Sequence, residues 1–236
     1  MTDFVLVPGA FHGGWCWRQV ADALLGAGHR VATPTLTGLA DRRHLLAADV
    51  DLDTHIDDIV NTIRYAEMDD LVLVCHSFGG VPGVGAADRL AERIRALVLL
   101  DALLPVDGLS SSEVRERSGS AWSMELVGRV AVDPPSSTLF GIPSEECGRI
   151  DALLTPHPVG TLVSPIALTG AYETIGTKRY HRFLRYAAPY MDDSADRATA
   201  AGWHVERHDL GHDAMLVAPD WTATALLEAE RVSRSD

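Results

Sequence analysis

Leu71-Val-Leu-Val-Cys-His-Ser77-Phe-Gly-Gly80 is the stretch around which the rest of the chain is organised. Its four leading apolar residues predict a buried strand, and residues 81–90 have the pattern of a helix. A serine on the sharp turn between such a strand and helix is the setting in which a hydroxyl becomes a nucleophile. The unpaired N–H groups at the start of the helix favour an oxyanion beside it. We therefore interpret Ser77 as a candidate nucleophile.

The turn departs from the usual pattern at one position. A strained serine needs small neighbours two positions away, and Gly79 meets that need, whereas Cys75 stands where glycine is more usual. The alternative is an ordinary strand-to-helix turn that happens to contain a serine. The apolar strand before it and the helix after it favour the nucleophile.

Bulk composition predicts one globular domain covering residues 1–236. The chain is 47% hydrophobic and shows no linker, repeat or low-complexity run. A net charge of −13 argues against a nucleic-acid or anionic-membrane partner. No stretch has the length needed to span a membrane, and the first residues lack the basic flank of a signal peptide. We expect a cytoplasmic protein that binds a small molecule, and the sequence leaves a homodimer possible.

The cysteines indicate neither a metal site nor a disulfide framework. Cys16, Cys75 and Cys147 are odd in number and widely spaced, which fits a reducing compartment. No dinucleotide-binding fingerprint stands out either. We therefore expect no metal and no cofactor.

Strands and helices alternate along the chain. Apolar runs predict buried strands at 4–7, 71–74 and 96–100, and we expect further strands at 30–33, 179–184 and 203–208. Helices are expected at 17–26, 54–67, 81–90, 193–202 and 220–232. This alternation predicts an α/β fold, a parallel sheet with helices on both faces. From about 105 to 178, prolines and glycines interrupt short helical pieces, which indicates a small helical cap inserted into the domain. Apolar cap residues such as Trp122 and Phe140 are candidates for lining a pocket.

Several chemically useful residues follow predicted strands directly. The glycine-containing segment 8–14, Ser77, Asp101 and His212 each stand at such a strand end. Because ligands of open α/β sheets bind beyond the carboxyl ends of the strands, we expect these residues to share one site.

A serine nucleophile needs a base and a carboxylate behind it. His212, in a glycine-flanked turn after the last strand, is the best base among the ten histidines. Asp101 is our candidate for the acid, and Asp192 and Asp193 are alternatives. We interpret His76 as structural, because adjacent side chains on a strained turn diverge.

The site also needs two N–H donors for a developing oxyanion. One is the N–H of Phe78, at the start of the helix that follows the turn. The other is the N–H of Ala10 or Phe11, in the loop after the first strand. His12, in the same loop, is a candidate for contacting substrate.

Taken together, these residues resemble the α/β-hydrolase superfamily. They are most similar to its small esterases, the branch with plant methylesterases, hydroxynitrile lyases and bacterial pyrethroid-hydrolase-like enzymes. The resemblance implies an α/β-hydrolase fold, Ser77 as nucleophile, His212 as base, and Ala10 and Phe78 as oxyanion donors. The matching segments run nearly end to end: Phe4-Val-Leu-Val-Pro-Gly-Ala-Phe-His-Gly-Gly-Trp-Cys-Trp17, Thr33-Pro-Thr-Leu-Thr-Gly38, His76-Ser-Phe-Gly-Gly80, Leu97-Val-Leu-Leu-Asp-Ala102 and Gly211-His-Asp-Ala-Met-Leu216. We expect substrate contacts from Phe11, His12, Trp122, Tyr186 and Met215.

Three positions depart from the pattern of these esterases. Pro8 replaces a histidine, and Cys75 replaces the first glycine of the turn. Tyr186 stands where the resemblance places the acid, and a tyrosine supplies no carboxylate. Either Asp101 takes the role from the neighbouring strand, as in some lipases of this fold, or the triad is incomplete.

Three functional hypotheses follow. The leading one is a serine hydrolase that cleaves a small to medium apolar carboxylic ester or lactone through an acyl-enzyme. The second is a non-hydrolytic lyase, eliminating or rearranging enzyme of specialised metabolism. Cyanohydrin cleavage is disfavoured, because the similar lyases carry lysine and threonine where this chain has Asp213 and Ala10. The third is a ligand-binding protein with a vestigial triad.

Overall fold

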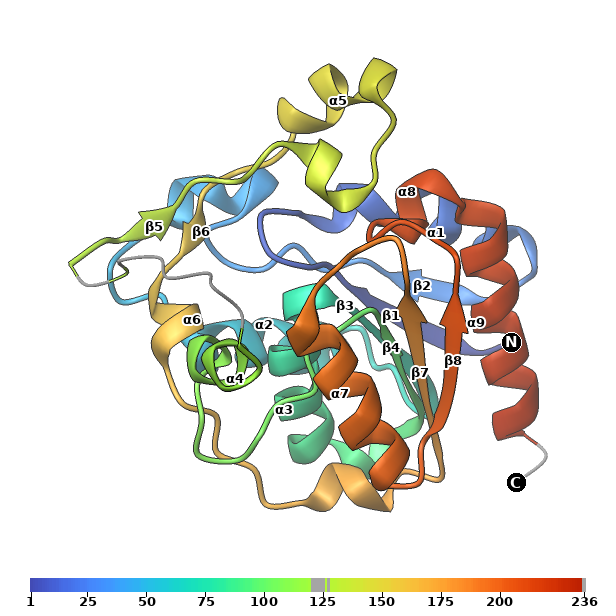
Figure 1. Ribbon diagram of the computed structural model, residues 1–236. Helices are drawn as coiled ribbons and strands as arrows, with labels where there is room; N and C mark the ends of the chain where they lie inside the picture. The colour runs from blue at the N-terminus through green and yellow to red at the C-terminus, as the bar shows by residue number, and fades with distance from the viewer. Residues whose placement is uncertain (120–125, 127, 235–236) are drawn as a thin grey trace.

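A six-stranded sheet in which all neighbouring strands pair in parallel forms the centre of the molecule (Figure 1). The computed structural model describes residues 1–119, 126 and 128–234. The strand order is β2-β1-β3-β4-β7-β8. The predicted α/β fold is therefore confirmed. The strands are β1 (Asp3–Val7), β2 (Arg30–Ala32), β3 (Leu71–His76), β4 (Ile94–Leu100), β7 (Thr177–Phe183) and β8 (His204–His208).

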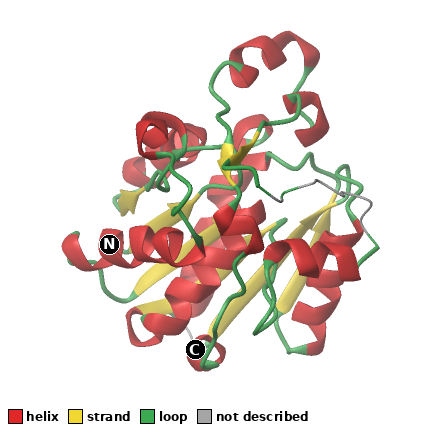
Figure 2. Ribbon diagram, turned by 90° about the vertical axis from the view of Figure 1, so that its left-hand side faces the viewer, coloured by secondary structure: helices red, strands yellow, loops and turns green. Residues whose placement is uncertain are grey.

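Helices cover both faces of this sheet (Figures 1 and 2). One face packs against α1 (Arg18–Gly26) and α9 (Pro219–Ser233), which also contact each other. The other packs against α2 (Leu52–Tyr65), α3 (Gly80–Arg89) and α7 (Pro189–Ala200). Alternate residues of each strand point to opposite faces, so Leu6 and Val74 join the core on the α1/α9 side, whereas Val5 and Leu73 join the core on the other.

The predicted strands match the structure to within a few residues at each end, while two helices begin two or more residues earlier than predicted. Helix α2 begins at Leu52 because Asp51 caps it: its carboxylate accepts the Thr54 N–H at 2.9 Å, and Thr54 Oγ1 accepts the Asp51 N–H in return. Helix α7 begins at Pro189, four residues before the predicted start, because proline is favoured in the first turn of a helix.

The segment between β4 and β7 forms the region that we predicted as a cap. It contains the antiparallel pair β5 (Ala131–Val132) and β6 (His157–Pro158) and the short helices α4 (Ser111–Arg117), α5 (Ser144–Asp151) and α6 (Gly160–Val163). In Figure 1, α5 stands at the top, beyond the ends of the strands. Trp122 lies outside the described residues. None of the helices described here is both long and apolar enough to cross a membrane.

Candidate active site

The turn after β3 holds Ser77 in a left-handed backbone conformation, with φ of 54°. A non-glycine residue pays a steric cost there, so such a conformation persists only where its surroundings enforce it. The enforcement is visible at Gly79, where a Cβ atom would lie 2.4 Å from the carbonyl oxygen of Pro8. This close approach holds the turn that carries Ser77 against the loop that follows β1.

Cys75 fits in place of the usual glycine because of a second small residue. A Cβ on Gly83 of α3 would lie only 2.2 Å from the Cys75 sulfur. The absence of a side chain at Gly83 thus leaves room on the helix for the Cys75 thiol. Complete burial raises the pKa of Cys75, so this thiol is a packed, un-ionised side chain.

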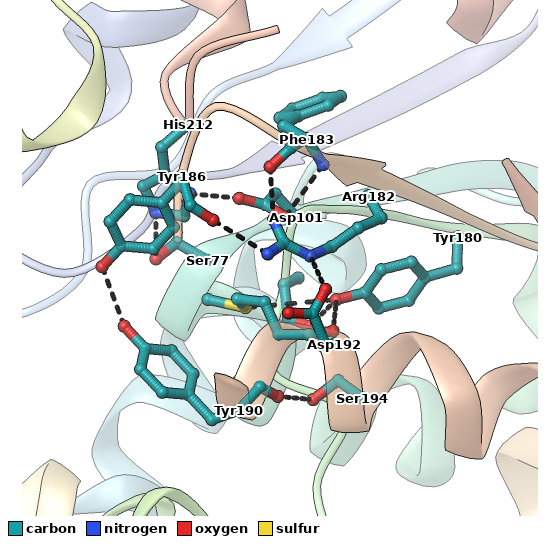
Figure 3. A network of polar contacts seen from close by, with 12 residues as sticks. Ser77, Asp101, Tyr180, Arg182, Phe183, Tyr186, Tyr190, Asp192, Ser194 and His212 are labelled. Carbon is teal, nitrogen blue, oxygen red and sulfur yellow. Dashed lines mark hydrogen bonds and ion pairs between the residues drawn. The ribbon is translucent and has the colours of Figure 1, made fainter. Parts of the chain in front are cut away.

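Ser77, His212 and Asp101 form a continuous hydrogen-bonded chain (Figure 3). His212 Nε2 lies 2.9 Å from Ser77 Oγ, and His212 Nδ1 lies 2.6 Å from Asp101 Oδ2. Because a carboxylate only accepts, Nδ1 carries the proton and Nε2 presents its lone pair to the serine hydroxyl. All three residues are buried. The geometry is that of a nucleophile, a base and an orienting acid.

Asp101 is fixed by contacts from the neighbouring strand β7. Its Oδ1 accepts Arg182 Nη1 at 2.9 Å and the Phe183 N–H at 3.1 Å, while its own N–H donates to the His181 carbonyl at 2.7 Å. Arg182 is only 2% exposed and also bonds Asp192 and the Tyr186 carbonyl, both at 2.8 Å. Sequence reasoning missed Arg182. The available signal was an arginine within the strand predicted at 179–184.

The two other carboxylates that the sequence left open are engaged elsewhere. Asp192 is paired with Arg182, as Figure 3 shows, and Asp193 with Arg197 at 2.9 Å. Both are substantially exposed. Of the three candidates, only Asp101 is recorded in hydrogen-bond contact with His212 among the contacts of the described residues.

Tyr186 occupies the place beside His212 that the resemblance assigns to the acid. Its ring stacks on the imidazole with centroids 4.1 Å apart and planes inclined by 27°, and its hydroxyl lies 2.8 Å from that of Tyr190. Burial, together with Tyr190, raises the pKa of Tyr186, so the phenol stays neutral. The position therefore holds a flat apolar wall, while the carboxylate comes from the end of β4.

The loop after β1 offers the Ala10 N–H as the candidate oxyanion donor. The Phe11 N–H instead donates to His157 Nδ1 at 3.4 Å, and Phe11 itself has a φ of 68°. Phe78, the other candidate, lies in the short 3₁₀ helix Ser77–Gly79 that leads into α3. Its N–H is among the unpaired donors that begin a helix.

A second buried histidine–carboxylate pair, His12–Asp213, lies next to the first. His12 Nε2 is 3.2 Å from Asp213 Oδ2, and His12 Nδ1 is 2.8 Å from the Ala10 carbonyl oxygen. Both neighbours are acceptors, so the ring satisfies both only as an imidazolium that donates from each nitrogen. Burial alone lowers the pKa of His12, but the Asp213 carboxylate outweighs it and raises the pKa. Burial likewise opposes ionisation of Asp213, yet His12 holds its pKa below the usual value.

His76 lies between these pairs as a neutral ring. Burial, followed by the neighbouring His212, lowers the pKa of His76 to about 3. Its Nε2 therefore carries the proton that is donated to the His212 carbonyl, 3.0 Å away. This contact supports the backbone of the His212 turn.

The Ser77 side chain opens onto a cavity of about 250 Å³. Phe11, His12 and Tyr186, three of the five predicted substrate contacts, line it. Met215 does not occur among the described lining residues and is buried in the core on the α1/α9 side, because the turn after His212 directs it there. Sequence reasoning missed Arg115 and Tyr190. The full lining is Ala10, Phe11, His12, His76, Ser77, Arg115, Pro135, Leu139, Phe140, Tyr186, Ala187, Ala188, Pro189, Tyr190 and His212.

Two groups of described side chains have ligand atoms spaced closely enough for a metal ion. One is His76, His212 and Asp213, and the other is His181, Glu206 and His208. In the first, His212 already uses both nitrogens toward Ser77 and Asp101. In the second, His181 Nδ1 and His208 Nε2 are hydrogen-bonded at 3.0 Å. In both groups, histidine nitrogens that could bind a metal ion are therefore already hydrogen-bonded to protein atoms.

The chain belongs to the alpha/beta hydrolase family, whose model matches residues 4–225. A carbendazim hydrolyzing esterase of a Nocardioides species is 36% identical over an alignment of 244 positions, which covers 96% of this chain and 98% of that protein. Methylesterase 1 of Arabidopsis thaliana is 32% identical over 150 residues, or 59% of this chain and 54% of that protein.

Solved structures show the same fold at low sequence identity. An extracellular alpha/beta-hydrolase from a Paenibacillus species superposes with a TM-score of 0.80 at 20% identity, covering 97% of this chain and 99% of that one. A pyrethroid hydrolase from Sphingobium faniae gives a TM-score of 0.75 at 19% identity, with 97% of each chain covered. The family and the fold that the sequence led us to expect are confirmed.

Proposed function

We propose that this protein is a serine esterase in which Ser77, His212 and Asp101 form the catalytic triad. The observation that carries the proposal is the hydrogen-bonded chain from Ser77 Oγ through His212 to Asp101 at the wall of the cavity. The similarity to an esterase along nearly the whole chain supports ester hydrolysis as the reaction.

In the first half of the reaction, Ser77 Oγ attacks the ester carbonyl carbon and its proton passes to His212 Nε2. Asp101 Oδ2 stabilises the imidazolium through the Nδ1–H bond. The N–H groups of Ala10 and Phe78 stabilise the negative charge on the former carbonyl oxygen. The tetrahedral intermediate then collapses, His212 donates the proton to the leaving alcohol, and Ser77 is left acylated.

In the second half, a water molecule takes the place of the alcohol. His212 Nε2 accepts a proton from it, and the resulting hydroxide attacks the acyl carbon. The second tetrahedral intermediate uses the same N–H donors. Its collapse releases the carboxylic acid and returns the proton to Ser77 Oγ.

Two further groups position this machinery without touching the reacting atoms. Arg182 holds Asp101 Oδ1, which leaves Oδ2 for His212. His12 holds the Ala10 carbonyl, which fixes the loop that carries the Ala10 N–H. Both are charged groups that act through a hydrogen bond of fixed direction.

The cavity suits a small to medium ester or lactone. Its volume is about 250 Å³, and much of its wall is apolar, with Pro135, Leu139, Phe140 and Ala188 among the lining residues. The lyase and vestigial-triad hypotheses drew their support from a missing acid, and the contact of Asp101 with His212 removes that support. A cytoplasmic location and a homodimer stay predictions.

Turnover of p-nitrophenyl butyrate by the wild type and by Ser77→Ala tests the proposal. We expect the wild type to release nitrophenol and, in mass spectra taken during turnover, to carry one butyryl group on Ser77. The variant should fold, as judged by circular dichroism, but lose both signals. Undiminished hydrolysis by folded Ser77→Ala would refute the proposal.

A further inference from the structure

Tyr186 covers one face of the His212 imidazole with its aromatic ring (Figure 3). The two ring centroids lie 4.1 Å apart, and the ring planes are inclined by 27°. The two nitrogens of the imidazole are already used, because Nδ1 bonds Asp101 at 2.6 Å and Nε2 faces Ser77 Oγ at 2.9 Å. The tyrosine therefore contacts the base through the ring face and leaves both nitrogens to their partners.

Tyr186 is held in this position through its side chain and through its backbone. Its hydroxyl bonds that of Tyr190 at 2.8 Å, and its carbonyl oxygen accepts Arg182 Nη2 at 2.8 Å. The same guanidinium donates to Asp101 Oδ1 at 2.9 Å. One buried arginine thus fixes both the carboxylate at the edge of His212 and the backbone of the tyrosine on its face.

The other titratable neighbours of His212 keep one charge state near neutral pH. His76, whose ring centroid lies 4.6 Å from that of His212, is neutral because burial lowers its pKa to about 3. Burial opposes ionisation of Asp213, but the contact with His12 outweighs it and lowers the pKa of that carboxyl. Burial raises the pKa of Tyr186, so its ring stays a neutral phenol. The charge that changes during the reaction is therefore that of His212.

When the Ser77 proton moves to Nε2, the imidazole becomes an imidazolium against the Tyr186 ring. The face of an aromatic ring is negative because of its quadrupole, and it attracts a cation within about 6 Å of the ring centroid. His212 is buried and Tyr186 is partly buried, and such an attraction is stronger where water is excluded. A neutral imidazole gains much less from the same contact. The ring therefore favours the charged state that forms in the transition state.

We propose that Tyr186 is a positioning residue of the esterase reaction, whose ring face stabilises the His212 imidazolium that forms when Ser77 is deprotonated. This inference rests on the proposed esterase function and deepens it. It gives the tyrosine a role at the position where the resemblance placed the acid. There the ring supports the charged base through its π face, while Asp101 supports the same base through an ion pair.

The pH dependence of kcat/KM for p-nitrophenyl butyrate tests the proposal, because its acid limb reports protonation of the base in the free enzyme. Tyr186→Leu removes the aromatic face but keeps an apolar side chain. The imidazolium then loses stabilisation, so the base stays neutral to lower pH. We expect the midpoint of the acid limb to move to lower pH by roughly 0.5 to 1 unit, while the plateau kcat/KM falls by about three- to thirtyfold.

Three further variants separate the ring face from packing. Tyr186→Phe keeps the face and should restore the wild-type midpoint. Pentafluorophenylalanine at position 186 keeps the shape of that ring but withdraws electron density from its face, so it should move the acid limb to lower pH as leucine does. This variant also serves as the test if Tyr186→Leu does not fold. Tyr65→Leu, a change at an 87% exposed residue at the end of α2, should leave midpoint and plateau at their wild-type values.

The other cationic side chains that line the cavity, His12 and Arg115, are the same in all these variants and so do not account for a difference between them. Two outcomes would overturn the inference. An acid limb of Tyr186→Leu at or above the wild-type midpoint would mean that the ring excludes water from His212 and does not stabilise its charge. Equal midpoints for pentafluorophenylalanine and Tyr186→Phe would mean that the electron density of the ring face has no effect. Failure of the esterase proposal is a separate result, because it would appear as undiminished hydrolysis by Ser77→Ala.

Discussion

Two buried histidine–carboxylate pairs lie side by side in this protein, and only one has the geometry of a catalytic pair. In the first, His212 bonds Asp101 through one nitrogen and Ser77 through the other. In the second, His12 bonds Asp213 through one nitrogen and the Ala10 carbonyl through the other. Residues 212 and 213 are adjacent in sequence, yet they belong to different pairs.

The second hydrogen-bond partner of each imidazole, the one opposite the carboxylate, determines whether the ring can act as a base. Ser77 Oγ carries a proton that it can donate, so His212 keeps a lone pair and can act as a base. The Ala10 carbonyl has no proton, so His12 has to donate there and has no lone pair to offer. The same pair of residue types thus yields a base in one place and a fixed cation in the other.

The largest expected effect comes from breaking the first pair with Asp101→Asn. The amide can donate to Nδ1 and so favours the tautomer in which Nε2 carries the proton, which prevents His212 from accepting the Ser77 proton. We predict that kcat falls by roughly 10³- to 10⁴-fold on a neutral ester, as for the acid of other serine triads. A stopped assay with excess enzyme measures the residual rate, and a loss of less than about tenfold would contradict the assignment.

Arg182→Gln probes the cation behind Asp101. Removing one partner of a buried ion pair leaves the other charge uncompensated, so we expect the free energy of unfolding to fall by about 3–5 kcal/mol in urea titrations. Arg185→Gln is the matched control, since its pair with Asp209 is exposed to solvent and should contribute little to the free energy of unfolding. Equal effects of the two variants would show that Arg182 does not hold a buried charge.

Asp213→Asn probes the second pair. His12 then loses the carboxylate that keeps it charged, and the Ala10 loop is held less firmly. We predict a fall in kcat of about tenfold, with KM nearly unchanged, because the loop stabilises the oxyanion more than the bound ester. His12→Gln should weaken the same support of the Ala10 loop. The fall in kcat of the double variant should therefore be smaller than the product of the two single-variant falls. Independent, multiplying effects would contradict the pairing.

The pH dependence of stability should distinguish a buried histidine that bonds a carboxylate, as His12 does, from one that bonds a neutral carbonyl, as His55 does. Burial lowers the pKa of His55 to about 4, although its Nε2 donates to the Thr37 carbonyl at 2.8 Å. The unfolded chain therefore binds a proton between pH 6.5 and 4 that the folded protein does not, and stability falls on acidification through this window. His55→Gln should reduce the slope by up to about 1.4 kcal/mol per pH unit.

The contribution of His12 to stability changes with pH in the opposite direction. Because its pKa is raised above 6.5 in the folded protein, the His12–Asp213 pair contributes fully below pH 6.5 and loses its contribution as the pH rises through the folded value. The lowered pKa of Asp213 sets the acid limit: the contribution is present above the unfolded value of 3.8 and is lost as the pH falls through the folded pKa. Urea titrations of the wild type and Asp213→Asn should therefore converge at alkaline pH. A constant difference from pH 6 to 10 would contradict a charged His12.

The sequence was sufficient to predict the elements that local patterns define. Apolar runs marked the strands, and strand ends marked Ser77, Asp101 and His212. The sequence did not reveal the role of Arg182 on β7, whose partner Asp101 follows the end of β4 and lies 81 positions away. Nor did it reveal the pairing of Asp213 with His12, which lies 201 positions away.

Met215 shows the limit of inference from proximity in the sequence. It follows His212 by three residues, yet the turn between them directs it into the core on the α1/α9 side. Tyr186 shows another limit, because its ring stacks on His212 and its hydroxyl bonds that of Tyr190 on α7, and neither contact is visible in the sequence. Side-chain direction and pairing across the sheet depend on the assembled fold.

The most direct test of the account is the rate at which a fluorophosphonate labels Ser77 in Asp101→Asn compared with Asp213→Asn. Intact mass gives the stoichiometry and peptide mapping gives the site. We predict one adduct per wild-type chain on Ser77, labelling slowed by roughly 10³-fold or more in Asp101→Asn, and only about tenfold in Asp213→Asn. Labelling of Asp101→Asn at the wild-type rate, or a larger loss in Asp213→Asn, would contradict the assignment of Asp101 as the triad acid.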